Sequence, residues 1–165
     1  MKKLTNSIFV LAVAVLLMAT NAVSAQITMN SKNCVGIWKT VDDETGRTKS
    51  HVEIYKNGND YHAKIIKLLD PQTLKDSGKD KFEDVTCDKC ADGHGKGGKM
   101  IGTEIVWDMV ADGDKWGNGK IMDPKKGKIY TCTMWMDGED KTGDTLKIRG
   151  WVGFFYRTQT WYRVK

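Results

Sequence analysis

Short apolar runs separated by turn residues occupy most of the chain from residue 35 onward. Each run has the length of a strand, and no long window has the period of a helix. Asn57-Gly58, between two of these runs, is a strong hairpin signal. The predicted strands are residues 35–41, 51–55, 61–69, 100–109, 115–122, 128–136, 145–155 and 158–164. About eight successive strands lose their unpaired edges by closing, so the pattern predicts an all-β, up-and-down antiparallel barrel.

The segment before the first strand has the three parts of a secretory signal peptide. Met1-Lys2-Lys3 is basic, residues 8–18 are almost wholly apolar, and Val23-Ser24-Ala25 offers small residues before a cut ahead of Gln26. The apolar run is well short of the roughly 20 residues that a membrane-spanning helix needs. We therefore expect a signal peptide over residues 1–25 and a periplasmic or secreted protein without a stable membrane span.

The remaining residues, 26–165, have the length of a single domain. A polar stretch rich in lysine, aspartate and glycine interrupts the strands at 70–99, where we expect a long and poorly ordered loop. The net charge of +5 becomes +3 once Lys2 and Lys3 leave with the signal peptide. Because basic and acidic residues are interspersed, a nucleic-acid partner is not expected.

One predicted strand, residues 128–136, carries the clearest candidate ligand wall. Alternation places Tyr130, Met134 and Met136 on one face together with Cys132, and the opposite face is more polar. Methionine and aromatic side chains suit a small apolar or amphipathic ligand, although such a stripe can also be plain core. Phe82, a large apolar residue within the polar stretch, is expected to fold back over a barrel opening.

The chain has four cysteines: Cys34, Cys87, Cys90 and Cys132. In an exported protein the pair C-D-K-C at 87–90 predicts a local disulfide. Two other interpretations remain open, a zinc site completed by His94 and an unidentified fourth ligand, and a redox couple. The redox interpretation is the weakest, because the glycines after His94 cannot continue the helix that such a couple needs. The pairing of the other two cysteines stays open.

The two ends of the predicted barrel carry a tryptophan and an arginine that could meet. In a closed sheet the first and last strands are neighbours, which brings Gly36-Ile37-Trp38 close to Arg163. A guanidinium laid on the indole would add a cation–π attraction and shield the ring from water. Arg163 or Arg149 could supply it, so these residues are the candidates for barrel closure.

A series of motifs gives the chain a family resemblance. They are G-I-W-K-T at 36–40, C-D-K-C at 87–90, G-N-G-K-I-M-D-P-K-K-G-K-I-Y at 117–130, L-K-I-R-G-W-V-G at 146–153 and R-T-Q-T-W-Y-R-V at 157–164. In this order they resemble the exported bacterial family called domain of unknown function 2147, and the Gly-x-Trp with a late arginine resembles the calycin and lipocalin signature. The resemblance implies a small barrel and an envelope location. It implies no activity and no catalytic residue.

No enzyme constellation emerges from the three histidines, His51, His62 and His94. Spacing alone assembles no Ser-His-Asp or Cys-His arrangement, and we expect neither catalysis nor a cofactor or metal. A barrel of this size can hold one small ligand among its inward side chains. The first hypothesis is therefore an exported binding module for a small apolar or amphipathic molecule. The alternative is an envelope protein-interaction or structural module with a filled barrel, whose partner the sequence does not name.

Overall fold

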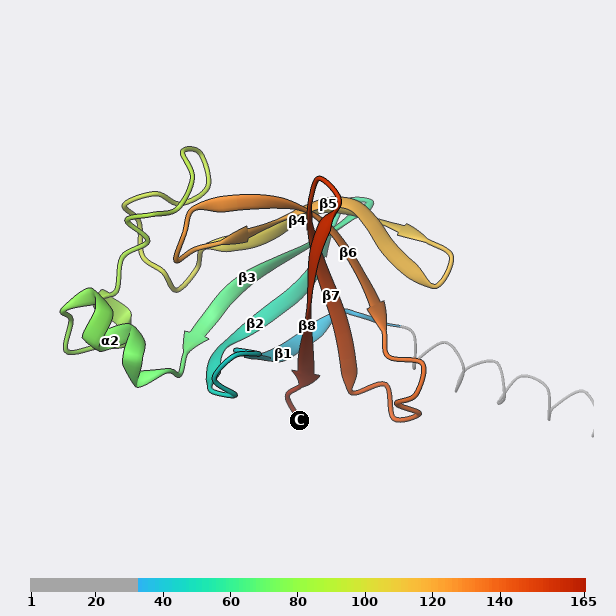
Figure 1. The fold of residues 1–165 in the computed structure, drawn as a ribbon, viewed down its shortest axis with the longest axis horizontal. Helices are drawn as coiled ribbons and strands as arrows, with labels where there is room; N and C mark the ends of the chain where they lie inside the picture. The colour runs from blue at the N-terminus through green and yellow to red at the C-terminus, as the bar shows by residue number, and fades with distance from the viewer. Residues whose placement is uncertain (1–32) are drawn as a thin grey trace, which may run out of the picture. The chain divides into compact units, whose positions relative to one another are not determined.

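A computed structural model describes residues 33–165, in which eight antiparallel strands close into one barrel (Figure 1). Each strand pairs with the next along the chain, and β1 pairs with β8 to complete the ring. The strands are β1 (Gly36–Val41), β2 (Thr48–Asn57), β3 (Asp60–Leu68), β4 (Glu104–Asp112), β5 (Lys115–Asp123), β6 (Lys128–Met136), β7 (Thr145–Val152) and β8 (Phe155–Arg163). The predicted fold class is confirmed. The predicted signal peptide, residues 1–25, lies outside the described residues.

One predicted strand was wrong at its end. Residues 145–155 were expected to form a single strand, but β7 stops at Val152 and β8 begins at Phe155. The sequence pattern did not predict the turn between them, because Val152, Phe154 and Phe155 have side chains that favour strands. Gly153 has φ 56°, a left-handed conformation that favours glycine, and it lets the chain reverse there.

The segment between β3 and β4 has more structure than the expected loop at 70–99. It contains the helix α2 (Pro71–Ser77), the 3-10 turn η1 (Phe82–Asp84) and a bridge between Thr86 and Lys99. Asp70 caps α2 by accepting a hydrogen bond from the Gln72 amide, and proline stands at the first helical position. Further along the segment, the side chains of Val85, Cys87 and Cys90 are buried in the core. The few apolar residues of this segment therefore fix it to the barrel.

The two ends of the barrel differ in what fills them. We call the end with the β2–β3 and β4–β5 turns the closed end, and the end with the β1–β2, β5–β6 and β7–β8 turns the open end. Inward alternation on β1, β2 and β6 packs the closed half with Trp38, Val52, Ile54, Cys132 and Met134, all at most 1% exposed. This core holds the strands together and leaves the open end for a site.

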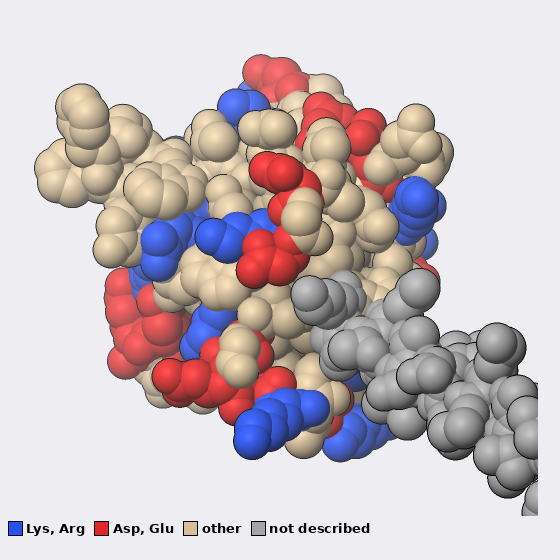
Figure 2. Space-filling view, turned by 90° about the vertical axis from the view of Figure 1, so that its right-hand side faces the viewer, with Lys and Arg blue, Asp and Glu red and all other residues tan. Residues whose placement is uncertain are grey.

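The charged side chains do not gather in a block on the face that Figure 2 shows. Lysines and arginines alternate there with aspartates and glutamates. Within the described part of the chain, no helix has the length and apolar character needed to cross a bilayer.

Candidate ligand-binding cavity

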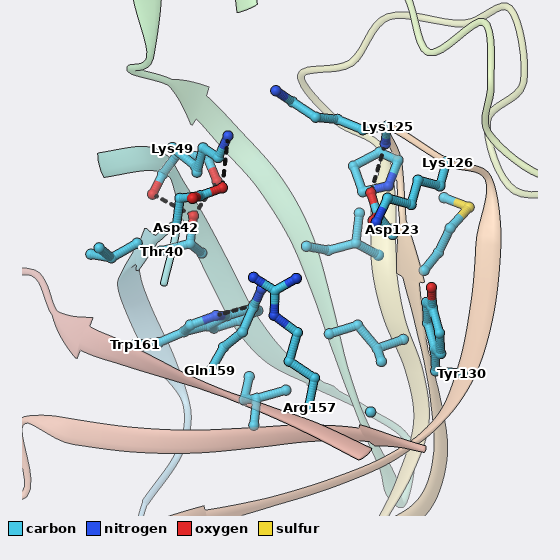
Figure 3. Close-up of a pocket in the computed structure, with 18 of the residues that line it drawn as sticks. Thr40, Asp42, Lys49, Asp123, Lys125, Lys126, Tyr130, Arg157, Gln159 and Trp161 are labelled. Atoms are coloured by element: carbon cyan, nitrogen blue, oxygen red, sulfur yellow. Dashed lines mark hydrogen bonds and ion pairs between the residues drawn. The ribbon is translucent and has the colours of Figure 1, made fainter. Parts of the chain in front are cut away.

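A cavity of about 740 Å³ opens at the open end of the barrel. This volume lies within the range of small-molecule sites, about 300 to 1,000 Å³. Apolar side chains from four strands form its inner wall: Ile65 of β3, Ile121 of β5, Ile148 of β7 and Trp161 of β8. Polar and charged side chains gather at its mouth, as Figure 3 shows. The cavity is thus apolar on its inner wall and polar at its mouth.

Strand alternation and one glycine keep this space open. On β8 the residues Arg157, Gln159 and Trp161 are two apart and all line the cavity. Gly150 of β7 lines it as well, and a Cβ atom at this position would lie 3.3 Å from Cβ of Tyr130. A larger residue at 150 would therefore take up room beside the tyrosine ring.

One side of the mouth carries a closed ion network. The Lys49 ammonium lies 3.2 Å from the Asp42 carboxylate and 3.4 Å from that of Asp70, whose side chain is fully buried. Burial opposes ionisation of Asp70, but the Gln72 amide and the cations Arg47 and Lys49 outweigh it and lower its pKa. These charges are satisfied by one another, so this network holds the β1–β2 turn and α2 in place.

Arg157 stands over the cavity between the Asp42–Lys49 pair and Tyr130 (Figure 3). Its Nε donates to Asp43 at 2.7 Å, and a second nitrogen donates to the other carboxylate oxygen. Glu44 lies 3.2 Å from the same guanidinium. The Asp43 hydrogen bond raises the pKa of Arg157, and the same contact lowers the pKa of Asp43. This fork ties β8 to the β1–β2 turn at the mouth.

On the other side of the mouth, the Lys126 ammonium and the Tyr130 hydroxyl have no polar partner among the described residues. Lys126 has no ion pair there, whereas its neighbour Lys125 lies 3.5 Å from Asp76. The Tyr130 hydroxyl has no hydrogen bond to any other described residue, and both side chains line the same side of the cavity (Figure 3). An ammonium and a hydroxyl at the mouth of an apolar cavity can bind the polar head of an amphipathic ligand. An anionic head suits them best, because the ammonium is positively charged.

The structure separates the four candidate ligand residues. Tyr130 lines the cavity, but Met134, Met136 and Phe82 do not. Met134 faces inward, as alternation predicted, yet four residues of strand carry it about 13 Å towards the filled half. Phe82 packs against the core and does not line the cavity, so the expected cover over the opening is not formed by its side chain.

The sequence reasoning also missed cavity residues. Arg157 and Gln159 are polar, and an alternating pattern assigns polar residues to the outer face. Their spacing with Trp161, each two residues apart, was the one signal that could have placed them inside.

Of the two arginines considered for barrel closure, Arg163 is the one that meets Trp38. Its guanidinium lies 4.2 Å from the ring centroid, and its Nη1 donates to the Val35 carbonyl at 3.0 Å. The indole Nε1 donates to the Cys34 carbonyl at 2.7 Å. Arg149 lies elsewhere, over the rings of Trp135, Trp151 and Tyr156. Of the two alternatives, Arg163 therefore stacks on Trp38 and Arg149 does not.

The cysteines divide into a bonded pair and two separate thiols. Cys87 and Cys90 form a disulfide, so in this state neither offers a thiolate to a metal. His94 stacks on Trp107 with 4.1 Å between ring centroids. Cys34 and Cys132 are free and buried, and burial raises the pKa of each to about 12.

One group of residues could hold a cation outside the cavity. Asp60, His62 and Asp108 have ligand atoms within 4.8 Å of one another. His62 Nδ1 already lies 2.9 Å from a Glu104 carboxylate oxygen. Asp60 adjoins the β2–β3 turn, so this group belongs to the closed end and not to the cavity.

Comparison with known proteins identifies the family. The model of a family described as "Uncharacterized protein conserved in bacteria (DUF2147)" matches residues 36–163. The chain belongs to the DUF2147 family. The matched span runs from the first residue of β1 to the last of β8, so the family model covers the whole barrel.

A solved structure has a similar fold. It is described as "Protein HP1028 from the human pathogen Helicobacter pylori belongs to the lipocalin family". The two chains are 18% identical, with a TM-score of 0.61, over 81% of this chain and 84% of the other. At this identity the match shows a shared lipocalin-like barrel and nothing finer. A comparison with curated proteins found no match.

Proposed function

We propose that this protein is an exported carrier that holds one small amphipathic molecule in the open end of its barrel. The observation that carries the proposal is the cavity of about 740 Å³ with an apolar inner wall and a charged mouth. A barrel filled from end to end would have no such space. The lipocalin-like fold and the predicted signal peptide support the same function, and the proposal includes no catalysis.

The cavity suggests how a ligand would lie. Its apolar part would cover Ile65, Ile121 and Ile148, where each buried methylene contributes about 0.8 kcal/mol. Its head would meet Lys126 and Tyr130, which are uncommitted among the described residues. The Asp43–Arg157 fork would stay intact, because the two side chains already satisfy each other.

The first test is what the exported protein carries. The full chain would be expressed with export, purified, and weighed by native and denaturing mass spectrometry. We expect a bound amphiphile that denaturation releases, and a polypeptide mass that corresponds to cleavage after Ala25. An unliganded protein that also fails to bind the probe described next would contradict the carrier function. An uncleaved chain would contradict the export prediction alone.

The second test uses the anionic fluorescent probe anilinonaphthalene sulfonate and a matched pair of variants. Ile121→Trp places a larger side chain in the cavity, whereas Ile129→Trp makes the same change at an outward position of β6 that is 41% exposed. We expect Ile121→Trp to weaken probe binding about tenfold or more, equivalent to about 1.4 kcal/mol, and Ile129→Trp to leave it unchanged. Equal affinities for the two variants would place the probe outside the cavity.

A third measurement tests the head-group side. Lys126→Ala should weaken binding of the sulfonate probe about threefold to tenfold, since a partly exposed charge contact is worth about 1 kcal/mol. An uncharged probe of similar size, N-phenylnaphthylamine, should bind Lys126→Ala and the unchanged protein alike. Equal losses for both probes would show that Lys126 acts through the shape of the cavity and not through its charge.

A further inference from the structure

The most exposed apolar side chains of the described residues lie together at one turn of the open end. Phe154, in the β7–β8 turn, is 97% exposed, and its neighbour Phe155 is 81% exposed. Val152 and Tyr156, on the strands that flank the turn, are 55% and 57% exposed. This hairpin tip projects from the barrel in Figure 1. These four neighbouring side chains form an exposed apolar patch, and patches of this kind mark sites that bind a protein or a membrane.

We infer that this tip, which we define as residues 152–156, docks the protein on a lipid bilayer with anionic headgroups. The backbone of the tip suits insertion, because β7 and β8 stay paired up to Val152 and Phe155. Only the two residues of the turn, Gly153 and Phe154, lie beyond the last pair. Few backbone polar groups would therefore lack a partner in the apolar part of the membrane.

Behind the tip the outer face of the barrel has the side chains of a membrane interface. Trp151 and Tyr156 pack with 4.9 Å between ring centroids, and the Arg149 guanidinium lies 4.1 Å from the Tyr156 centroid. Arg149 is held by a hydrogen bond from its Nε to Thr158 at 2.8 Å. Tryptophan and tyrosine favour the headgroup level of a bilayer, and a neighbouring arginine can reach lipid phosphates.

Two lysines at the same end can attract an anionic surface, because the acidic Asp42, Asp43 and Glu44 of the β1–β2 turn are already paired with Lys49 and Arg157. Lys125 and Lys126 stand in the β5–β6 turn, and Lys126 has no ion pair among the described residues. Cations near an anionic membrane are attracted to its surface, and salt weakens this attraction. A bilayer also fits the shape of the tip better than a second copy of the chain would. A stable protein interface buries about 800 Å² on each partner, which a narrow hairpin tip does not provide.

Docking in this way would turn the mouth of the cavity towards the membrane. Val152 and Phe155 belong to the tip and also line the cavity. An amphipathic molecule could then pass between bilayer and cavity along one apolar surface. This inference goes beyond the proposed function, because the tip could bind a membrane even if the cavity held no ligand.

The test is co-sedimentation of the purified protein with vesicles, either of phosphatidylglycerol and phosphatidylethanolamine or of phosphatidylcholine alone. We expect binding to the first kind, weaker binding at high salt, and little binding to the second. Phe154→Ser removes the outermost ring and should weaken binding about tenfold or more. The matched control is Val110→Ser on β4, 42% exposed, which should bind as the unchanged protein does.

Phe154 does not line the cavity, so the two proposals can fail separately. Phe154→Ser should bind the sulfonate probe normally in the absence of vesicles and should unfold at the same denaturant concentration. The docking inference is overturned if the unchanged protein binds neither kind of vesicle, or if Phe154→Ser binds vesicles as well as the unchanged protein does. Concentration-dependent dimers in sedimentation equilibrium that Phe154→Ser abolishes, without vesicle binding, would assign the tip to self-association instead.

Insertion itself can be measured with Phe154→Trp. Bromine-labelled lipid chains should quench the fluorescence that this tryptophan adds, whereas a tryptophan placed by Val110→Trp should be unaffected. If the labelled lipids quench neither tryptophan, insertion of the tip is contradicted.

Discussion

Trp38 and Trp161 lie on neighbouring strands of the same barrel, and both side chains are buried, yet they belong to different regions. Trp38 is enclosed at the closed end, with its indole nitrogen bound to the Cys34 carbonyl and Arg163 over its ring. Trp161 forms part of the cavity wall, and its indole nitrogen donates to Gln159 at 3.3 Å. The first contacts protein on all sides, whereas the second borders a space.

This difference teaches that burial alone does not show what a residue does in a barrel. At the closed end a change of side chain removes packing and should cost stability. At the open end the surface lining the cavity has fewer protein contacts to lose, so a change there should alter binding more than folding. The predictions below test this contrast, beginning with the largest effect.

The largest effect is expected for Trp38→Ala. It removes a fully buried ring, its hydrogen bond to the Cys34 carbonyl and its contact with Arg163, so we expect a loss of about 3 to 5 kcal/mol in the free energy of unfolding. Chemical denaturation measures it. Trp135→Ala is the control, because that ring is only half-buried on the outer face, and it should cost clearly less. Equal costs would show that enclosing a ring at the closed end adds no stability beyond that of a tryptophan on the outer face.

The next effect concerns Asp70, the buried charge beside the mouth. Asp70→Ala removes the cap of α2 and the partner of Lys49, and we expect a loss of about 3 kcal/mol at pH 7. Arg47 is about half exposed and should contribute little of this. Because the folded pKa of Asp70 is lowered, its charge stabilises the protein above the unfolded pKa, and that contribution is lost as the pH falls.

Asp70→Asn separates the charge from the cap, because the amide oxygen can still accept from Gln72. Its stability should lie below that of the unchanged protein at pH 7, and the gap should narrow as the pH drops below about 4. Urea unfolding at a series of pH values measures the gap. A gap that stays constant down to pH 2 would show that the Asp70 charge is not what stabilises this side of the mouth.

The smallest effect is expected from the disulfide. The Cys87–Cys90 bond closes a very short loop, so the chain-entropy model gives a stabilisation of about 2 kcal/mol at most. Thiol labelling of the folded protein without reductant should modify no cysteine, because burial raises the pKa of Cys34 and Cys132 to about 12. Denaturation should expose two thiols, and added reductant four. Four thiols without reductant would exclude the bond.

Much of the fold could be predicted from local patterns, and much of the site could not. The hairpin at Asn57-Gly58 and the strand Lys128–Met136 were readable, because turn chemistry and alternation act over a few residues. Turn chemistry failed at Gly153, where apolar neighbours continued the strand pattern. Phe82 was misplaced for a different reason, since the apolar surface that a loop residue covers belongs to distant strands.

By itself the sequence determined that the chain is all-β, that its first and last strands would meet, and that Trp38 and an arginine would lie there. Only the tertiary structure decided which arginine, because Arg149 and Arg163 lie on opposite faces of their strands, and alternation does not say which face turns inward. It also decided where the cavity lies. A cavity is the volume left when side chains from several strands are summed, and small residues such as Gly150 at one end create it without any motif of their own.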